Sequence, residues 1–202
     1  MEDWDQLTPV LEGKLVRLEP LSAAHEQELW EAGQDREIWR WLPINASASR
    51  EHFHAWLEQR LADDAAGRSA MFATIDLASA KAIGATGYHA LRPEHRGLEI
   101  GWTWLAQAQW RGGANIETKL LLLDYAFEEL NCIRVEFKTE EFNERSRKAL
   151  AGIGARFEGV FRSHMIVRGE VIRDSAYYSI IASEWPETRA ALERRLARHA
   201  PN

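Results

Sequence analysis

Residues 98–123 read LEIGWTWLAQAQWRGGANIETKLLLL, and this stretch decides the fold. Its first part, residues 98–105, predicts a β-strand that follows the turn-like segment RPEHRG. Apolar residues then recur at helical spacing from residue 116 to residue 127, which predicts a helix over residues 112–130. The stretch is therefore interpreted as a strand, a glycine-containing turn and a long helix.

The turn between strand and helix is suited to binding an anion. Gly112, Gly113 and Ala114 leave the backbone uncovered, so consecutive N–H groups can approach phosphate oxygens while the helix dipole favours negative charge. The spacing is neither GxGxxG nor the GxxxxGK of a Walker loop. This difference argues against a dinucleotide-binding unit and against a nucleotide triphosphatase.

The remaining elements surround this stretch in a simple order. Alternation predicts strands, helical spacing of apolar residues predicts helices, and glycine or proline marks their ends. The order predicts one mixed α/β domain over residues 1–202, with seven strands in a mainly antiparallel sheet and helices on both faces. The expected strands cover residues 15–19, 71–75, 82–91, 98–105, 133–138, 157–167 and 171–181, and the expected helices cover 22–33, 49–67, 112–130, 143–152 and 186–199.

The charge balance limits the classes of partner. The 202 residues include 25 Lys and Arg against 31 Asp and Glu, a net charge of -6. No global basic field is available to hold a nucleic acid or an anionic membrane surface, so neither partner is expected. The longest uniformly aliphatic run, Leu120–Leu123, is far shorter than the roughly 20 apolar residues of a membrane span.

Cysteine and tryptophan usage give two further indications. A single cysteine, Cys132, cannot form an internal disulfide or a CxxC zinc site, and the acidic start of the chain does not resemble a secretory signal. Both features are typical of a protein of the reducing cytoplasm. Nine Trp residues suit a large core, an aromatic cleft or a subunit contact, and the last alternative suggests a homodimer.

Three sequence features together resemble one enzyme family. Residues 109–114 read QWRGGA, and this QxxGxA pattern between a strand and an apolar helix resembles the acetyl-CoA pyrophosphate loop of the GNAT acyltransferases. Asn143 and Ser146 match the NxxS segment of that superfamily. The closing RDSAYYSI and EW resemble its ribosomal-protein N-acetyltransferase (Rim-type) branch, and the resemblance covers about residues 12–186. It implies a twisted sheet that is splayed where coenzyme A enters.

The resemblance implies a set of acetyl-CoA contacts. The backbone of residues 104–106 would pair with the pantetheine arm, and N–H groups of residues 111–115 would hold the pyrophosphate. Arg111 is the preferred source of local positive charge, whereas Asn143 is equally a helix cap. The expected cofactor-binding residues are Trp104, Leu105, Ala106, Gln109, Arg111, Gly112, Gly113, Ala114, Asn115, Asn143 and Ser146, and further cations that could serve this site are Lys119, Arg145, Arg147 and Lys148.

The implied chemistry is direct attack of an amine on the acetyl thioester in a ternary complex. Glu99 matches a glutamate that many GNAT enzymes use as the base, although it is equally a residue of a polar strand face. His89 is the alternative base. Many members carry a tyrosine as the acid toward the CoA thiolate, where this chain has Leu150. Ser146 is the expected hydrogen-bond donor to that thiolate, with water as the alternative.

The acceptor amine is less defined. An N-terminal α-amine of a protein or peptide and a small amine are both compatible with the resemblance, and so are an acyl donor other than acetyl-CoA and a non-catalytic acyl-CoA sensor. No metal site is expected, because His52 and His54 diverge around their helix. The expected acceptor-binding residues are Trp39, Trp41, His89, His164 and Tyr178, and further candidates are Arg40, Tyr88, Asp174 and Tyr177, each of which could instead pack in the core.

Overall fold

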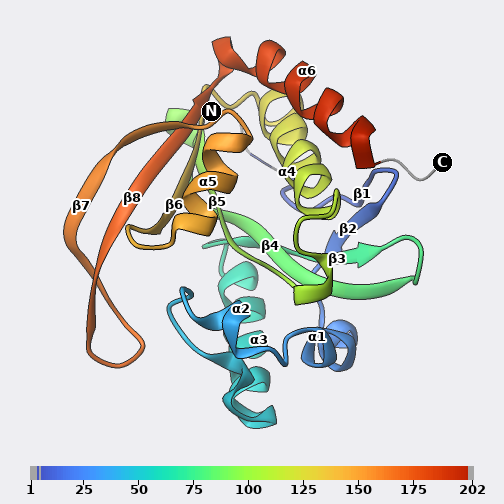
Figure 1. The fold of residues 1–202 in the computed structure, drawn as a ribbon, viewed down its shortest axis with the longest axis vertical. Helices are drawn as coiled ribbons and strands as arrows, with labels where there is room; N and C mark the ends of the chain where they lie inside the picture. The colour runs from blue at the N-terminus through green and yellow to red at the C-terminus, as the bar shows by residue number, and fades with distance from the viewer. Residues whose placement is uncertain (1–3, 5, 200–202) are drawn as a thin grey trace.

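The computed structural model describes residue 4 and residues 6–199. In this part of the chain, eight strands form one sheet in the order β1-β2-β3-β4-β5-β6-β8-β7 (Figure 1). The strands are β1 (Leu11–Glu12), β2 (Val16–Pro20), β3 (Ala70–Asp76), β4 (Lys81–Arg92), β5 (Gly97–Leu105), β6 (Arg134–Glu140), β7 (Arg156–Val167) and β8 (Val171–Ile181). The helices are α1 (Glu26–Ala32), α2 (Arg36–Trp39), α3 (Arg50–Ala65), α4 (Ala114–Asp124), α5 (Glu144–Gly152) and α6 (Trp185–Leu196).

The mixed α/β architecture with a mainly antiparallel sheet is confirmed, with two short additions. The strand that was not expected, β1, has two residues and is too short to show alternation. It forms by pairing with Leu18 and Arg17 of β2. The four-residue helix α2 is capped by Asp35, whose side chain accepts a hydrogen bond from the Glu37 N–H group. The long helix begins at Ala114 and continues after Asp124 as one π-helical turn, before Asn131 ends it with a φ of 51°.

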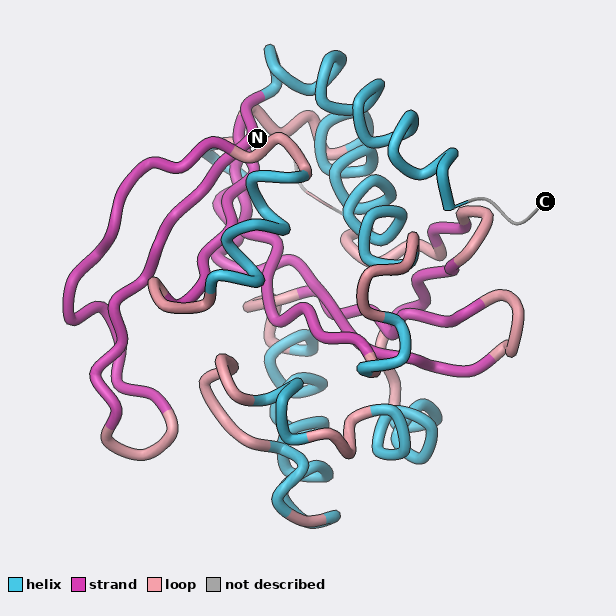
Figure 2. Tube along the Cα trace, viewed as in Figure 1, coloured by secondary structure: helices cyan, strands magenta, loops and turns pink. Residues whose placement is uncertain are grey.

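The helices lie on both sides of the sheet (Figure 2). On one side α4 and α6 pack over buried strand residues such as Leu98 and Ile100. On the other side α1, α2 and α3 cover β3, β4 and β5 through a cluster that contains Trp39, Trp56 and Trp104. All nine Trp residues are buried or half-buried, and all except Trp41 belong to or pack against the hydrophobic clusters, so most of the enrichment in Trp reflects the core.

Strands β5 and β6 separate shortly after they meet. They form the one parallel pair in the described part of the sheet, and their pairing covers Gly97, Leu98 and Glu99 of β5. Beyond Glu99, β5 stays with β4 and β6 stays with β8. A bulge at Trp102, where φ is 50°, helps β5 turn away. The sheet therefore has a split between β5 and β6, and the β5 edge that faces this split has no strand partner.

No helix within the described ranges is both long enough and apolar enough to cross a lipid bilayer.

Candidate active site

The glycine-containing loop lies at the end of β5, directly before α4. Its first part is fixed by the Trp110 indole, which donates a hydrogen bond to the Leu105 carbonyl at 3.0 Å. Arg111 follows in a left-handed conformation with φ of 67° and is exposed. Gly113 is buried, and a Cβ atom there would lie 2.4 Å from Leu15 Cδ1. The second glycine is therefore required by space, whereas a Cβ at Gly112 would meet only the Gln109 carbonyl oxygen at 3.4 Å.

Helix α4 begins at this loop without a capping side chain. The N–H groups of its first turn have no intrahelical acceptor, so they remain available to an anion supplied by a ligand. Gln109, Arg111, Gly112, Ala114 and Asn115 all lie in this loop or in that first turn. The backbone thus offers what a pyrophosphate requires.

Helix α5 begins beside the loop. The Arg145 guanidinium lies 3.7 Å from the centre of the Trp110 ring, which brings the first turn of α5 against the loop. Asn143 caps this helix, since its side chain accepts a hydrogen bond from the Ser146 N–H group at 3.1 Å. The two segments that the sequence links to coenzyme A therefore meet, and the capping interpretation of Asn143 is confirmed.

The other expected cations serve different partners. Arg147 donates to the Tyr178 hydroxyl at 3.0 Å, and Lys148 donates to Glu144 at 2.9 Å. Lys119 is not a surface residue at all, because it is only 5% exposed. Arg111 and Arg145 are therefore the cations that lie at the loop.

Glu99 lies where β5 and β6 begin to separate. Its side chain is buried and accepts a hydrogen bond from Lys138 Nζ at 2.9 Å. In the sheet register it stands between His89 of β4 and Glu136 of β6. The carboxylate borders a cavity of about 300 Å³ on the sheet face away from α4, and this cleft is lined by Ala90, Arg92, Glu99, Arg134, Glu136, Lys138, Glu158, Gly159, Phe161 and Tyr177.

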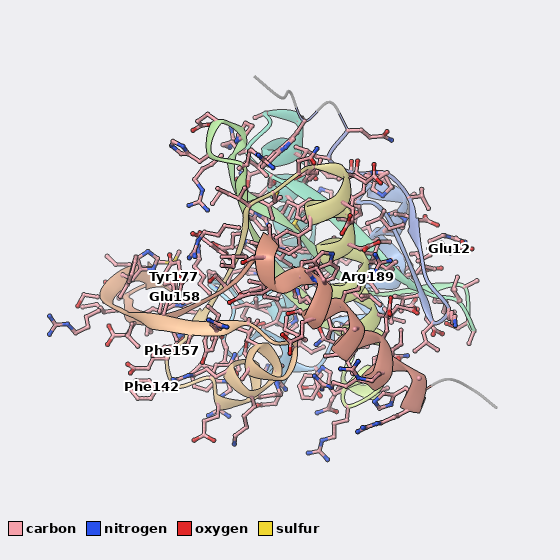
Figure 3. The ribbon with its side chains drawn as sticks, turned by 90° about the horizontal axis from the view of Figure 1, so that it is seen from above. Glu12, Phe142, Phe157, Glu158, Tyr177 and Arg189 are labelled. Carbon is pink, nitrogen blue, oxygen red and sulfur yellow. The ribbon has the colours of Figure 1, made fainter. Side chains whose placement is uncertain are left out.

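Most charges in this cleft are paired. Arg92 and Arg134 contact Glu136 at 2.8 and 2.9 Å, and Arg134 also contacts Glu158. The hydrogen bond from Arg134 lowers the pKa of Glu158 to about 2, so this carboxylate stays ionised and is a poor base. Figure 3 labels Glu158 and Tyr177 on the hairpin that forms one wall of the cleft.

His164 and Tyr177 extend that wall. His164 Nδ1 lies 3.0 Å from the Ser175 hydroxyl, and the Tyr177 hydroxyl lies 3.4 Å from His164 Nε2. Burial lowers the pKa of His164, so the ring is neutral at pH 7. Tyr177 therefore lines the cleft, and His164, an expected acceptor-binding residue, contacts Tyr177 without being among the residues that line the cleft.

His89 is unsuited to the alternative role of base. The residue is half-buried beside Glu99, and its buried Nε2 atom has no hydrogen-bond partner among the described residues. Burial lowers the pKa of His89 to about 3, which makes the imidazole far too weak a base at neutral pH. Glu99 is thus the better candidate of the two.

Two expected acceptor residues lie in the core. Trp39 is 1% exposed, and its indole N–H group donates to the Gly33 carbonyl at 2.7 Å. Tyr178 is also buried and packs against Phe157 on the opposite face of the sheet from Tyr177, because neighbouring strand residues alternate. Neither side chain reaches the cleft, so their assignment to acceptor binding is corrected.

Trp41 lies at a second hollow of about 340 Å³, which it shares with Phe142, Asn143 and Arg145. This placement puts Trp41 beside the residues linked to coenzyme A rather than beside Glu99.

Leu150 is buried in the core, so no hydroxyl replaces the tyrosine of the wider superfamily at that position.

The sequence reasoning missed Lys138 and Arg134. Both belong to RVEFKTE, residues 134–140, where every second residue is charged. That alternation places the side chains on one face of β6, and it could have identified them.

Among the described residues no group of three or more His, Cys, Asp or Glu side chains is arranged to hold a metal ion.

Comparisons with known proteins agree with this geometry. The family described as "Acetyltransferase (GNAT) domain" matches residues 16–156. The Bacillus subtilis (strain 168) protein named "Putative ribosomal N-acetyltransferase YdaF" is 31% identical over 173 residues, which cover 83% of this chain and 90% of YdaF. The "Uncharacterized N-acetyltransferase YoaA" of the same organism is 34% identical over 99 residues, which cover 49% of this chain and 55% of YoaA. The match thus spans about half the length of YoaA.

A solved structure shares the fold over the whole of this chain. The crystal structure of a GCN5-related N-acetyltransferase from Brucella melitensis is 33% identical, with a TM-score of 0.89 over 100% of this chain and 91% of that chain. The split sheet, the uncapped helix after the loop and these matches lead to one conclusion: the chain belongs to the GNAT family of acyl-CoA-dependent N-acyltransferases.

Proposed function

We propose that the protein transfers an acetyl group from acetyl-CoA to a primary amine, with the N-terminal α-amine of a protein or peptide as the first acceptor class and a small amine as the second. One observation carries the proposal. Glu99 borders the cleft at the point where β5 and β6 separate, and the same strand leads into the loop before α4. A base and an anion-binding loop thus flank one split in the sheet.

The residues at the split fit acetyl-CoA. The N–H groups of residues 111–115 would hold the pyrophosphate. The β5 edge that faces the split would pair with the pantetheine arm at Trp104 and Leu105, whereas both backbone groups of Ala106 are already hydrogen-bonded, to Ile83 and Gln109. Asn143 and Ser146 would border it from α5. When bound, acetyl-CoA supplies an activated acyl carbonyl and a thiol leaving group.

Glu99 would accept the proton of the amine, directly or through one water molecule. Lys138 holds its carboxylate in place through the 2.9 Å contact. An α-amine with a pKa near 8 costs only about 1 kcal/mol to deprotonate at pH 7, whereas a lysine near 10.4 costs about 4 to 5 kcal/mol. A carboxylate therefore suits the α-amine better, and the name of the relative YdaF, a ribosomal N-acetyltransferase, supports the same class.

The first test is calorimetric titration with acetyl-CoA, followed by thiol release with a panel of peptides, polyamines and aminoglycosides. Binding with release that depends on an acceptor supports the proposal and identifies the acceptor class. An absence of binding contradicts the assignment of the loop. Thiol release with a longer acyl-CoA but not with acetyl-CoA would show that the acyl donor is the longer acyl-CoA.

Substitution of the base is the second test. Glu99→Gln should lower kcat by about 10²-fold or more, most strongly at low pH where free amine is scarce, with an unchanged Kd for acetyl-CoA. The exposed Glu94→Gln, in the turn before β5, is the matched control and should retain full activity. An unaltered rate of Glu99→Gln across pH would eliminate this role.

A non-catalytic acyl-CoA sensor is the second candidate. The buried Leu150, in place of a tyrosine acid, favours it. Tight binding without release for every acceptor in the panel would support the sensor.

A homodimer and a cytoplasmic location are part of the proposal. Side chains of the β7–β8 hairpin, including Phe157, Phe161 and Ile172, are exposed and could pack against a second copy. The buried free thiol of Cys132 suits a reducing compartment. A monomer mass by light scattering would contradict the dimer.

A further inference from the structure

Lys119 lies inside the split sheet and not on the surface of α4. Its Nζ atom donates a hydrogen bond to the Thr103 hydroxyl at 2.6 Å. Thr103 follows the bulge at Trp102 directly, and its hydroxyl lies 2.7 Å from that of Thr86 on β4. The ammonium group is thus attached to β5 beyond the point where the pairing with β6 has ended.

The other side of the ammonium group faces β6. Nζ lies 5.8 Å from the centre of the Phe137 ring, and Phe137 is the first β6 residue beyond the paired segment. The side chain of Lys119 therefore reaches from α4 to the gap between the two diverging strands.

This cation lacks an anionic partner. Within the described part of the chain, its three N–H donors form one hydrogen bond, to a neutral hydroxyl, and no carboxylate lies within ion-pair distance. Glu99 is paired with Lys138, and Glu117, on the same helix, accepts backbone N–H groups of residues 14–16. On β4 neither titratable neighbour is an anion, since burial lowers the pKa of His89 to about 3 and raises the pKa of Tyr88, whose hydroxyl donates to the Leu122 carbonyl. A buried cation without a counterion is costly, which is typical of groups that act on a ligand.

We propose that Lys119 is the proton donor to the sulfur of coenzyme A, and this inference rests on the proposed function. Leu150, at the position of the tyrosine acid of the wider family, has no hydroxyl to fill that role. As the amine nitrogen bonds to the acyl carbon and the carbon–sulfur bond breaks, the amine proton passes to Glu99 and the Lys119 proton passes to sulfur. Free thiol leaves, and Lys119 and Glu99 then exchange protons with water to restore the starting state.

The acidity of Lys119 agrees with this role. Burial lowers the pKa of its ammonium group to about 7. An ordinary thiol has a pKa near 8.5, so proton transfer from Lys119 to a leaving thiolate is favourable. Before transfer, the same positive charge stabilises the thiolate.

The experiment measures the pH dependence of kcat together with the Kd for CoA. Wild-type protein is compared with Lys119→Met, which removes the charge, and with Lys119→Gln, which keeps a donor to Thr103. The exposed Lys81→Met on β4 is the charge control, and Ser146→Ala tests the rival donor. Wild-type kcat should fall as pH rises through the Lys119 pKa of about 7, because the donor loses its proton. In both Lys119 variants this fall should be absent and kcat should be lower by about 10²-fold with an unchanged Kd for CoA, whereas Lys81→Met should keep the wild-type profile.

Each outcome decides the matter. A wild-type pH profile of kcat in Lys119 variants that remain folded and bind CoA overturns the role of Lys119, and so does loss of the high-pH fall in Ser146→Ala alone. Acceptor-dependent thiol release by the wild-type protein shows that the proposed function itself stands. Failure of wild-type protein to bind CoA overturns the proposed function, and this inference falls with it.

Discussion

Removal of the Glu117 carboxylate should destabilise the protein more than most single substitutions. Glu117 is 2% exposed on α4, and its two oxygens accept hydrogen bonds from three consecutive backbone N–H groups. Oε1 accepts from Lys14 at 2.8 Å, and Oε2 accepts from Leu15 and Val16 at 2.6 and 2.7 Å. The residue therefore ties the helix that follows the loop to the start of the sheet.

The magnitude follows from these three bonds. A hydrogen bond to a charged group contributes roughly 1.5 to 3 kcal/mol, and an orphaned buried donor costs a similar amount. With partial relaxation of the segment, Glu117→Ala should lose about 4 to 6 kcal/mol of unfolding free energy. For a chain of this size that loss lowers Tm by roughly 10 to 20 °C.

Urea unfolding and thermal melting would measure the effect. Glu117→Gln should lose about half as much, because one amide oxygen can still accept the two Oε2 bonds while the amide nitrogen faces the Lys14 N–H group. Glu128→Ala, an exposed glutamate of the π-helical turn, is the control and should stay within about 0.5 kcal/mol of wild type. A loss below about 1 kcal/mol in Glu117→Ala would refute the reasoning.

Two further predictions concern the loop and His89. Gly113→Ala should lose about 1 to 3 kcal/mol of unfolding free energy, measured with urea, and should weaken acetyl-CoA binding, because its Cβ would lie 2.4 Å from Leu15 Cδ1. Gly112→Ala should change both quantities far less. Equal effects of the two substitutions would contradict the packing argument. Because burial lowers the pKa of His89 to about 3, the unfolded chain binds a proton that the native state does not between that value and about 6.5. The unfolding free energy should therefore fall by up to about 1.4 kcal/mol per pH unit as pH drops below 6.5, and His89→Gln should show a shallower fall between pH 6 and pH 4.

Local patterns carried most of the fold. The strand, loop and helix of residues 98–123 depend on neighbouring residues, so the sequence was sufficient to predict them. Helix α2 was missed because four residues cannot display a helical period. Tyr178 was preferred as an acceptor-binding residue and Tyr177 was only a further candidate, since both belong to one strand and only the register with β6 decides which of them faces the core.

The burial of polar residues on α4 was the main feature that could not be predicted from the sequence. Polar residues of a helix are expected to face water, but Glu117, Thr118 and Lys119 are all buried. The helix is enclosed by the sheet and by α6. Glu117 has its partners at the start of β2 and in the loop before it, Lys119 has its partner on β5, and the Thr118 hydroxyl has no hydrogen-bond partner among the described residues. Those partners are about 100 and 16 residues away in sequence, so no local pattern indicates them.

The separation of β5 from β6 has a consequence for solubility. Strand edges with free peptide groups invite strands of other molecules to add on, and soluble proteins usually keep such edges short, charged or covered. Here two open edges lie in the middle of the sheet and face each other, with Lys119 of α4 held between them. The backbone that can pair with an extended ligand is therefore protected from pairing with strands of other molecules.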